Sequence, residues 1–97
     1  MPTYARLARF DRDFAALTTE QRRQFLAAVE KFVADLRAGE GFRAGLRVKG
    51  VRGAAGVYEL TWAGDGRATF NYGDSVRDDE PHIVWRRIGT HDVLSRP

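Results

Sequence analysis

The chain has 97 residues, which is the size of one small domain with a single core. Hydrophobic residues make up 43% and charged residues 30% of the sequence, and this balance argues against disorder. Cysteine is absent, which excludes disulfides, thiolate catalysis and cysteine-bound metal. No apolar run reaches the roughly 18 residues of a membrane span, and the first residues lead into no signal-peptide core. We therefore expect a soluble, cytoplasmic protein with one domain over residues 1–97.

The net charge is basic, because 16 lysines and arginines stand against 13 acidic residues. Lys31 and Lys49 are the only lysines, and the arginine that makes up the rest carries a planar guanidinium that suits phosphate. Two interpretations of this excess stay open: a nucleic-acid partner, or the composition of a GC-rich coding sequence. Positive charge is concentrated in the second half and is interrupted by an acidic loop at 74–80. This pattern indicates one modest basic patch and not a protein that coats DNA.

The N-terminal part predicts a short strand and a short helix. Residues 4–8 are predicted to form the strand. After it, Phe10, Phe14 and Leu17 recur at helical spacing, and this first helix is expected to stop near Thr18.

A longer helix is predicted to follow. Thr18 and Gln21 form a capping-box pattern, which satisfies free backbone N–H groups at a helix start. The apolar residues between Phe25 and Leu36 form one stripe, and Gly39 supplies the C-terminal stop. The helix then has about 20 residues and a length of roughly 30 Å.

The second half of the chain predicts strands joined by short turns. Residues 46–49 and 58–62 alternate apolar and polar side chains, as half-buried strands do. The Gly-Asp-Gly sequence at 64–66 predicts a hairpin turn, because glycine accepts positive φ at no steric cost. Residues 67–72 alternate again, and 83–88 carry apolar side chains on both faces, which is typical of a strand inside a sheet.

The order of these elements predicts an α+β fold, in which the helical pair covers one face of a small antiparallel sheet. The opposite face is then expected to be open. By alternation it carries polar and basic residues, namely Arg47, Lys49, Glu59, Thr61, Arg67 and Asn71. Arg86 and Arg87 lie between apolar neighbours in the last strand, so at least one of them is expected to reach the open face or a carboxylate. We expect the function to reside on this open face.

Three segments carry motifs in a characteristic order. Residues 45–53 read GLRVKGVRG and lead to GVYEL at 56–60; residues 65–72 read DGRATFNY; and residues 87–94 read RIGTHDVL. In this order they resemble the RelE/ParE superfamily of bacterial toxin–antitoxin toxins, and the last segment resembles the Gly-Thr-His ending of its YafQ-like branch. The resemblance covers essentially the whole chain and implies the RelE-like form of the α+β fold.

The resemblance also implies a function. Ribonuclease members of the family cleave messenger RNA in the ribosomal A site through attack by the 2′-OH. The chain is therefore expected to be an endoribonuclease that inhibits translation and needs neither a metal ion nor a cofactor. Its implied partners are RNA, the ribosome and a cognate antitoxin in a hetero-oligomer. His91 matches the catalytic histidine of the YafQ-like branch, Arg67 the strand arginine that faces the scissile phosphate, and Asp65 the acidic hairpin residue.

A set of cations is expected to bind the RNA: Arg47 and Lys49, which match the family's basic strand pair, and Arg87. An acidic antitoxin segment is expected to meet the same cations and Arg67. A histidine with a pKa near 6.5 can accept or donate a proton at neutral pH, and arginines that face the phosphate stabilise the transition state. No histidine or carboxylate pair has the helical spacing of metal ligands.

Departures from the family pattern leave other functions open. The YafQ-like branch has further histidines in the part that corresponds to 43–62, where this chain has none, and Ser95 replaces an aromatic residue. The alternatives are a ParE-like toxin that binds and poisons DNA gyrase, and a catalytically silent binding module. Trp62 and Trp85 are interpreted as core residues or as base-stacking residues, and His82 as structural or solvent-facing.

Overall fold

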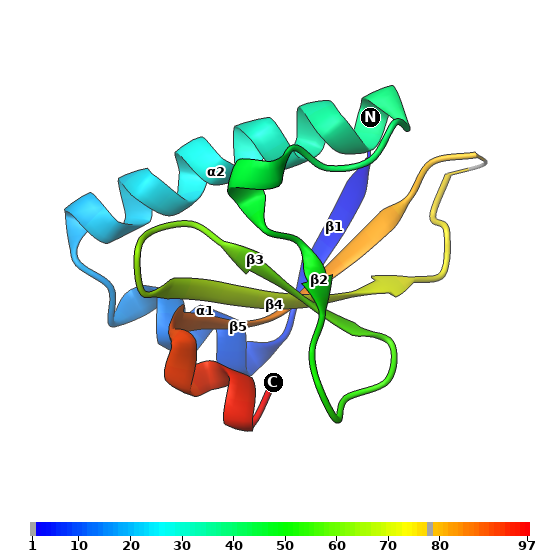
Figure 1. Ribbon diagram of the computed structural model, residues 1–97. Coiled ribbons are helices and arrows are strands. Elements are labelled where there is room, and N and C mark those ends of the chain that lie inside the picture. Colours follow the sequence, from blue (N-terminus) through cyan, green and yellow to red (C-terminus); the bar gives the residue numbers. More distant parts are fainter. Residues whose placement is uncertain (1, 78) are drawn as a thin grey trace.

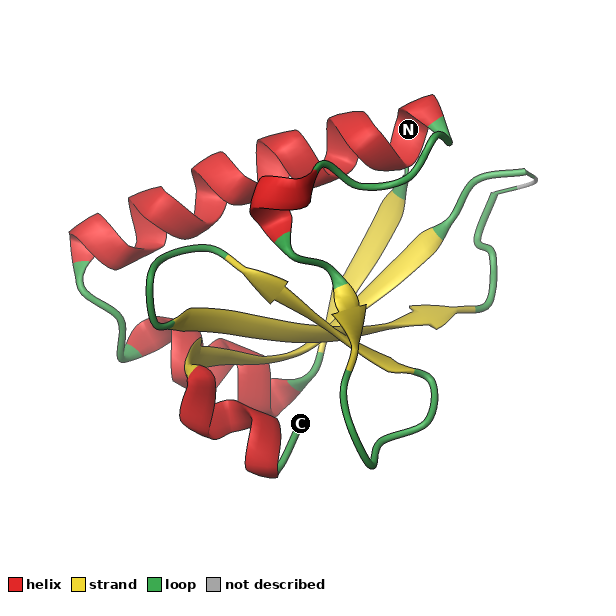
Figure 2. Ribbon diagram, viewed as in Figure 1, coloured by secondary structure: helices red, strands yellow, loops and turns green. Residues whose placement is uncertain are grey.

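The computed structural model describes residues 2–77 and 79–97 and shows helices packed against a mixed, five-stranded sheet (Figures 1 and 2). The elements are, in chain order, β1 (Thr3–Arg6), α1 (Ala8–Ala15), α2 (Thr19–Ala38), the 3₁₀ turn η1 (Ala44–Leu46), β2 (Lys49–Gly50), β3 (Val57–Thr61), β4 (Gly66–Gly73), β5 (His82–Thr90) and the 3₁₀ turn η2 (His91–Ser95). The strand order is β1-β5-β4-β3-β2. The predicted α+β class is confirmed.

The sheet differs from the expected antiparallel one at its first strand. Strands β2 to β5 are antiparallel, but β1 pairs with β5 in parallel. The Leu7 N–H extends this contact by donating to the Trp85 carbonyl at 2.9 Å. A parallel partner needs a long crossover, and here the chain between β1 and β5 contains both helices and the other strands. This pairing between the two ends of the domain has no local signal in the sequence.

Helix α2 begins and ends as the sequence predicts. The Thr18 hydroxyl accepts from the Gln21 N–H at 3.1 Å, and the Gln21 side chain accepts from the Thr18 N–H at 2.8 Å, which completes the capping box. At the other end Gly39 is left-handed, with φ of 70°. Among the described residues, no helix has the length and the apolar character needed to cross a membrane.

The core between α2 and the sheet is built from aromatic rings. The Phe32 ring lies 5.1 Å from that of Phe70 on β4 and 5.5 Å from that of Trp85 on β5. Phe10 brings α1 into the same core, 6.1 Å from Trp85, and Trp62 is buried after β3. Tilted and edge-on pairs of this kind stabilise by about 0.5–1.5 kcal/mol beyond area burial. Both tryptophans are therefore core residues.

A β-bulge in β5 changes which side chains face the core. Phe70 lies opposite Trp85, but Thr69 lies opposite Arg87, so Arg86 is the extra residue. The bulge lets Trp85 and Ile88 face the same core although they are three positions apart. Arg87 is left on the face opposite the core.

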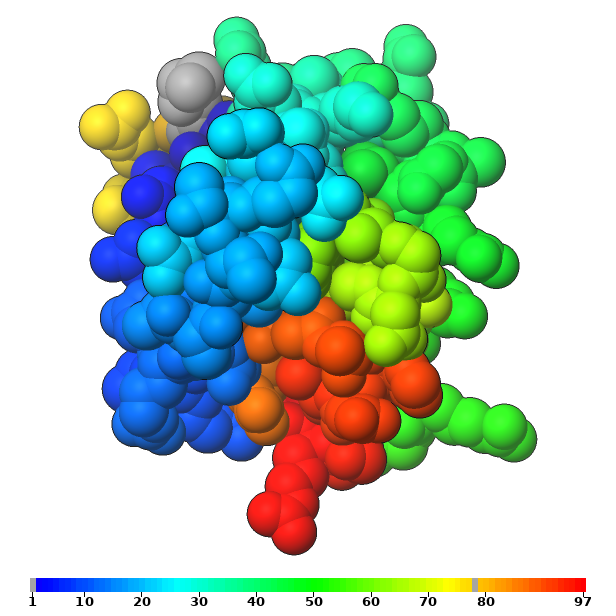
Figure 3. Space-filling view, turned by 90° about the vertical axis from the view of Figure 1, so that its left-hand side faces the viewer, coloured from blue at the N-terminus to red at the C-terminus, as the bar shows by residue number. Residues whose placement is uncertain are grey.

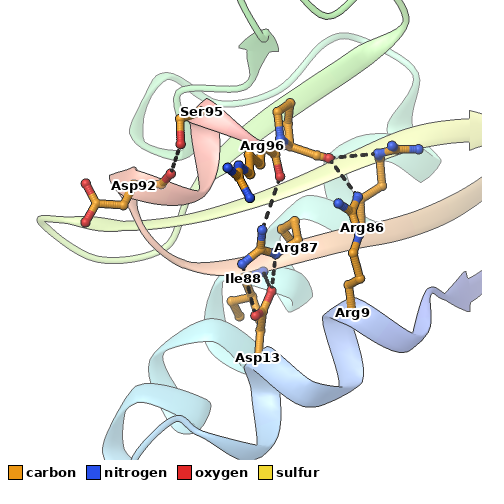
Figure 4. Close-up of polar contacts among 9 residues, drawn as sticks. Arg9, Asp13, Arg86, Arg87, Ile88, Asp92, Ser95 and Arg96 are labelled. Atoms are coloured by element: carbon orange, nitrogen blue, oxygen red, sulfur yellow. Dashed lines mark hydrogen bonds and ion pairs between the residues drawn. The ribbon is translucent and has the colours of Figure 1, made fainter.

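Helix α1 covers the edge of β5 beyond the end of β1 (Figure 4). The Asp13 carboxylate accepts from the Ile88 N–H at 3.2 Å and from the Arg87 guanidinium at 2.6 and 3.2 Å. Asp13 thus satisfies a strand N–H that no neighbouring strand reaches, and it raises the pKa of Arg87 by hydrogen bonding. The expectation that Arg86 or Arg87 reaches a carboxylate is confirmed for Arg87.

The sheet face opposite α2 is not fully open, which corrects the sequence prediction. The C-terminal segment from η2 onward folds over its β4–β5 end, with Val93 buried over Gly89. Carbonyls of this segment accept from the arginines beneath it: that of Arg96 from Arg87, and that of Pro97 from Arg86, each at 3.2 Å (Figure 4). Toward β2 and β3, Lys49 is exposed as expected, whereas Glu59 is buried.

The strand predicted at 46–49 is wrong except at Lys49. Leu46 ends η1 and is buried, and Arg47 has left-handed backbone angles of φ 49° and ψ 44°. Strand β2 is limited to Lys49–Gly50. The chain must turn here between the end of α2 and β3, and the turn overrides the alternation of Leu46 and Val48. Arg47 and Lys49 therefore do not share a strand face.

The hairpin predicted at 64–66 is present, but its second glycine is needed for another reason. Neither Gly64 nor Gly66 has a positive φ in the left-handed range. The Trp62 ring lies over Gly66, and a Cβ at position 66 would be 2.6 Å from two ring carbons. Gly66 is required by close packing and not by backbone conformation.

Replacing Gly66 tests this packing. Gly66→Ala is expected to lower the free energy of unfolding by about 1–3 kcal/mol, because its Cβ overlaps a buried ring. Gly64→Ala is the matched control: its Cβ meets nothing within 4 Å, so stability should stay within about 0.5 kcal/mol of the parent. Urea unfolding measures both, and equal midpoints would contradict the packing requirement.

The edge contact of Asp13 gives a second stability prediction. Asp13→Ala removes the acceptor of a guanidinium and of a strand N–H, and is expected to cost about 2 kcal/mol. Asp11→Ala, on the same helix, removes an exposed ion pair with Arg6 and should cost at most about 1 kcal/mol. Thermal unfolding of the two variants compares them. A larger loss in Asp11→Ala would show that Asp13 does not secure the edge.

Candidate active site

His91 and Asp65 meet where β4 begins and β5 ends. Gly66 of β4 lies opposite Thr90 of β5, so the residue before Gly66 and the residue after Thr90 become neighbours. The His91 Nδ1 lies 2.5 Å from the Asp65 Oδ1. The two side chains are 63% and 62% exposed, so the pair is accessible to a ligand.

The carboxylate controls the proton on His91. The hydrogen bond and the charge of Asp65 raise the pKa of His91 above its ordinary value of 6.5, and Asp92, 3.7 Å from Nε2, adds to this effect. In turn, the hydrogen bond to His91 lowers the pKa of Asp65. The protonated pair stabilises the fold below pH 6.5, and this contribution is lost as the pH rises through the raised pKa of His91. His91 therefore keeps its proton to a higher pH than an ordinary histidine.

Arg67 lies next to this pair and is turned back onto the hairpin. Its Nη1 donates to the carbonyls of Gly66 at 3.0 Å and Gly64 at 3.3 Å, and its Nε lies 3.9 Å from the Glu59 carboxylate. Its positive charge acts on His91 by lowering the pKa slightly against the effect of Asp65. Arg67 is thus ordered close to the pair, on the side of the sheet that faces away from the core.

Glu59 is a participant that sequence reasoning did not assign to the site. Its side chain is buried, yet it lies on the same face as Arg67 and its carboxylate faces the guanidinium. Lys49 is its register partner on β2 and so lies on the same face. The signal was present in the sequence as an acidic residue between two apolar ones, but its pairing with Arg67 depends on the β3–β4 register.

The remaining predicted cations lie elsewhere. Arg47 lines a hollow between α2 and the β3–β4 hairpin, beside Thr61 and Gly64. Arg87 is on the same sheet face as Arg67, but Asp13 and the Arg96 carbonyl hold its guanidinium. The structure therefore brings His91, Asp65 and Arg67 together, with Lys49 and Arg87 on the sheet face of Arg67. Arg47 lies outside this face, and the guanidinium of Arg87 is already bound.

The second histidine has a structural role. The His82 Nδ1 lies 2.7 Å from the Thr3 hydroxyl and links β5 to β1. Of the two interpretations of His82, structural or solvent-facing, this contact favours the structural one. Within the described parts of the chain, no three histidine, aspartate or glutamate side chains are grouped as metal ligands are. The chemistry that the exposed cluster can supply is proton transfer at His91 and charge stabilisation by Arg67.

Comparison with known proteins identifies the fold. No family model and no curated protein matches the sequence. The Escherichia coli DinJ–YafQ toxin–antitoxin complex matches with a TM-score of 0.65 and 14% identity, over 96% of both chains. The RelB–RelE antitoxin–toxin complex of Methanococcus jannaschii matches with a TM-score of 0.60 and 15% identity, over 95% of both. The chain has the fold of RelE- and YafQ-type toxins.

A third similar structure is a copper-bound mutant toxin from Helicobacter pylori, with a TM-score of 0.62 and 17% identity, over 97% of this chain and 99% of that one. These structures cover nearly the whole chain. The RelE-like fold implied by the sequence motifs is thus confirmed. At such low identity the similarity establishes the fold, and the residues of the site have to be argued from their own geometry.

The raised pKa of His91 can be measured directly. In an NMR titration of the imidazole, the pKa of His91 is expected above 6.5, and Asp65→Asn should lower it because the stabilising carboxylate is gone. Asp92→Asn is the control and should lower it less, because Asp92 is farther away. A pKa that is unchanged in Asp65→Asn would show that the two side chains are not paired in solution.

Proposed function

We propose that this chain is the toxin of a toxin–antitoxin system and that it cleaves messenger RNA through attack by the RNA's own 2′-OH, without a metal ion. The observation that carries the proposal is the exposed His91–Asp65 pair beside Arg67. The fold supports it, since the similar structures are toxins, two of them in complex with an antitoxin. Messenger RNA on the ribosome is the proposed substrate.

His91 is the proposed general acid. In the cleavage step the 2′-oxygen bonds to phosphorus and gives up its proton to water, while the bond from phosphorus to the 5′-oxygen breaks. The leaving 5′-oxygen takes a proton from His91, and the products are a 2′,3′-cyclic phosphate and a free 5′-OH. Asp65 holds Nδ1, which leaves Nε2 to deliver the proton. Such proton transfer contributes about 10²–10⁴-fold to a rate.

Arg67 is the proposed stabiliser of the transition state. Negative charge accumulates on the phosphate oxygens as the 2′-oxygen adds, and a fixed guanidinium lowers the energy of that charge. The two hairpin carbonyls and Glu59 restrain the Arg67 side chain, so little reorganisation is needed. Lys49 contributes a second positive charge on the same face as an RNA-binding residue. Arg87 is held by Asp13 and is left out of this set.

An antitoxin protein is the proposed partner. The complexes of YafQ with DinJ and of RelE with RelB, which share this fold, support this assignment. An apolar hollow of about 220 Å³ between β1, α1 and α2 gives such a partner a place to dock. Tyr4 and Leu26 at this hollow are 64% and 55% exposed, and an apolar surface of this kind is typical of a protein interface.

Induced expression in a bacterial host tests the function. The parent chain is expected to arrest growth and to create new 5′ ends in a reporter messenger RNA, mapped by primer extension. His91→Ala should lose both effects, because the leaving oxygen no longer receives its proton, with a drop in cleavage of about 10²–10⁴-fold. Arg12→Ala, an exposed cation on α1, is the control and should behave as the parent does.

Two outcomes would overturn the proposal. Growth arrest that persists in His91→Ala without new 5′ ends, and with DNA damage, would indicate a gyrase-directed toxin. A folded parent chain that causes no arrest and no cleavage would indicate a silent binding module. Circular dichroism of each purified variant confirms that it is folded.

A further inference from the structure

A groove runs along one side of α2 and ends next to the candidate active site. One hollow of about 430 Å³ lies between α2 and the β3–β4 hairpin, and Arg47 and Gly64 line it. A second hollow of about 390 Å³ continues to Asp65 and Thr90. The two share Gln24, Trp62 and Ala63, so they form one groove, here named the α2 groove. In Figure 3 the hairpin tip lies beside α2 on one side and the C-terminal segment on the other.

The helix side of the α2 groove is a stripe of polar and small residues. Gln21, Gln24, Ala28 and Lys31 are three or four positions apart and so share one face of α2. From Gln21 to Lys31 this stripe is about 15 Å long. The Gln21 amide is used in the capping box, whereas Gln24 is exposed and, within the described residues, makes no hydrogen bond.

The end of the groove away from His91 is positively charged. Lys31 on α2 and Arg47 after η1 are both exposed there, and no ion pair involves either of them among the described residues. Arg47 lines the groove from a left-handed backbone conformation, with φ of 49°, which residues other than glycine rarely adopt. By contrast, Arg43, Arg67 and Arg87 each face a carboxylate.

We propose that the α2 groove binds a single-stranded segment of RNA that extends from the active site, with Lys31 and Arg47 on its phosphates and Gln24 between these cations and the active site. This inference rests on the proposed function, because that function places an RNA strand at His91. A strand that leaves His91 and Asp65 enters the groove directly, since Asp65 lines it. The neighbouring cations at the far end complement a phosphate backbone.

An RNA strand fits the groove better than a peptide does. Apart from the buried Trp62 and the partly buried Leu17, the lining is small or polar, and it has no exposed large apolar side chain for a peptide to anchor on. The exposed apolar side chains Tyr4 and Leu26 lie at the hollow between β1, α1 and α2 instead. A protein partner is therefore expected at that hollow, which leaves the groove for the nucleic acid.

Salt-dependent binding of an RNA that the protein cannot cleave tests the inference. The probe is a short, fluorescein-labelled 2′-O-methyl oligonucleotide, which has no free 2′-OH, and its anisotropy is measured over a series of salt concentrations. Each phosphate contact with a single strand contributes about 0.7 to the slope of log K against log salt. The variant Lys31→Ala/Arg47→Gly should therefore lower the slope by about 1.4. Glycine is chosen at 47 because it accepts the left-handed backbone.

The matched control is Arg12→Ala/Arg37→Ala. It removes the same charge from exposed helix positions that do not line the α2 groove, and its slope should stay close to that of the parent. Equal slopes in both double variants would overturn the groove as an RNA site, and the proposed function would stand if the parent still cleaves RNA in cells. If the parent binds no RNA while the groove variant alone loses affinity for an acidic peptide, the groove is a protein site and the inference is overturned.

Discussion

The pairing of β5 with β1 on one side and with β4 on the other holds the structure together. It joins the first strand of the chain to the last, and it places Trp85 under both helices. Where β1 ends, α1 takes over its place at the edge of β5, and Asp13 accepts the N–H group that a further strand would have bonded. Because β4 is in register with β5 up to Gly66 and Thr90, the same pairing brings the hairpin to the start of η2. The candidate site thus depends on the register between β4 and β5.

Carboxylates sort the basic residues of this protein into different roles. Asp13 holds Arg87, Glu59 faces Arg67, and Asp65 contacts His91. A guanidinium paired at the sheet edge is a structural element, whereas one restrained beside an exposed histidine is prepared for an incoming anion. The modest excess of positive charge in the sequence therefore does not act as a uniform field. Among the described cations without an ion pair, Lys31 and Arg47 line the α2 groove and Lys49 lies on the sheet face of Arg67.

Local patterns predicted the elements whose structure is determined by neighbouring residues. The capping box at Thr18, the apolar stripe of α2 and the glycine at 39 all act within a few residues, and the structure has each of them. The parallel place of β1 and the edge role of Asp13 depend on residues more than 70 positions away, so no local pattern contains them. The alternation of Leu46 and Val48 was misleading because the chain turns there.

The candidate site was predictable only through motifs. His91, Asp65 and Arg67 were chosen together from their place in the motifs, and the β4–β5 register brings them together in space. Arg47 was placed with them because the sequence predicted a strand, and the left-handed turn moves it to the α2 groove. The C-terminal cover over the sheet could not be read from η2, since its short run of residues gives no indication of which surface it packs on.

The bulge at Arg86 sets the register of every residue that follows it in β5. It adds one residue to β5, and that single addition decides which side of the sheet each later residue meets, down to the point where His91 leaves the strand. The place of the imidazole is therefore encoded in the number of residues after Trp85 as much as in their kinds. An insertion or deletion of one residue in this stretch would exchange the inner and outer sides of everything that follows. Proteins that share this bulge and this site should accordingly keep the spacing between the core tryptophan and the histidine.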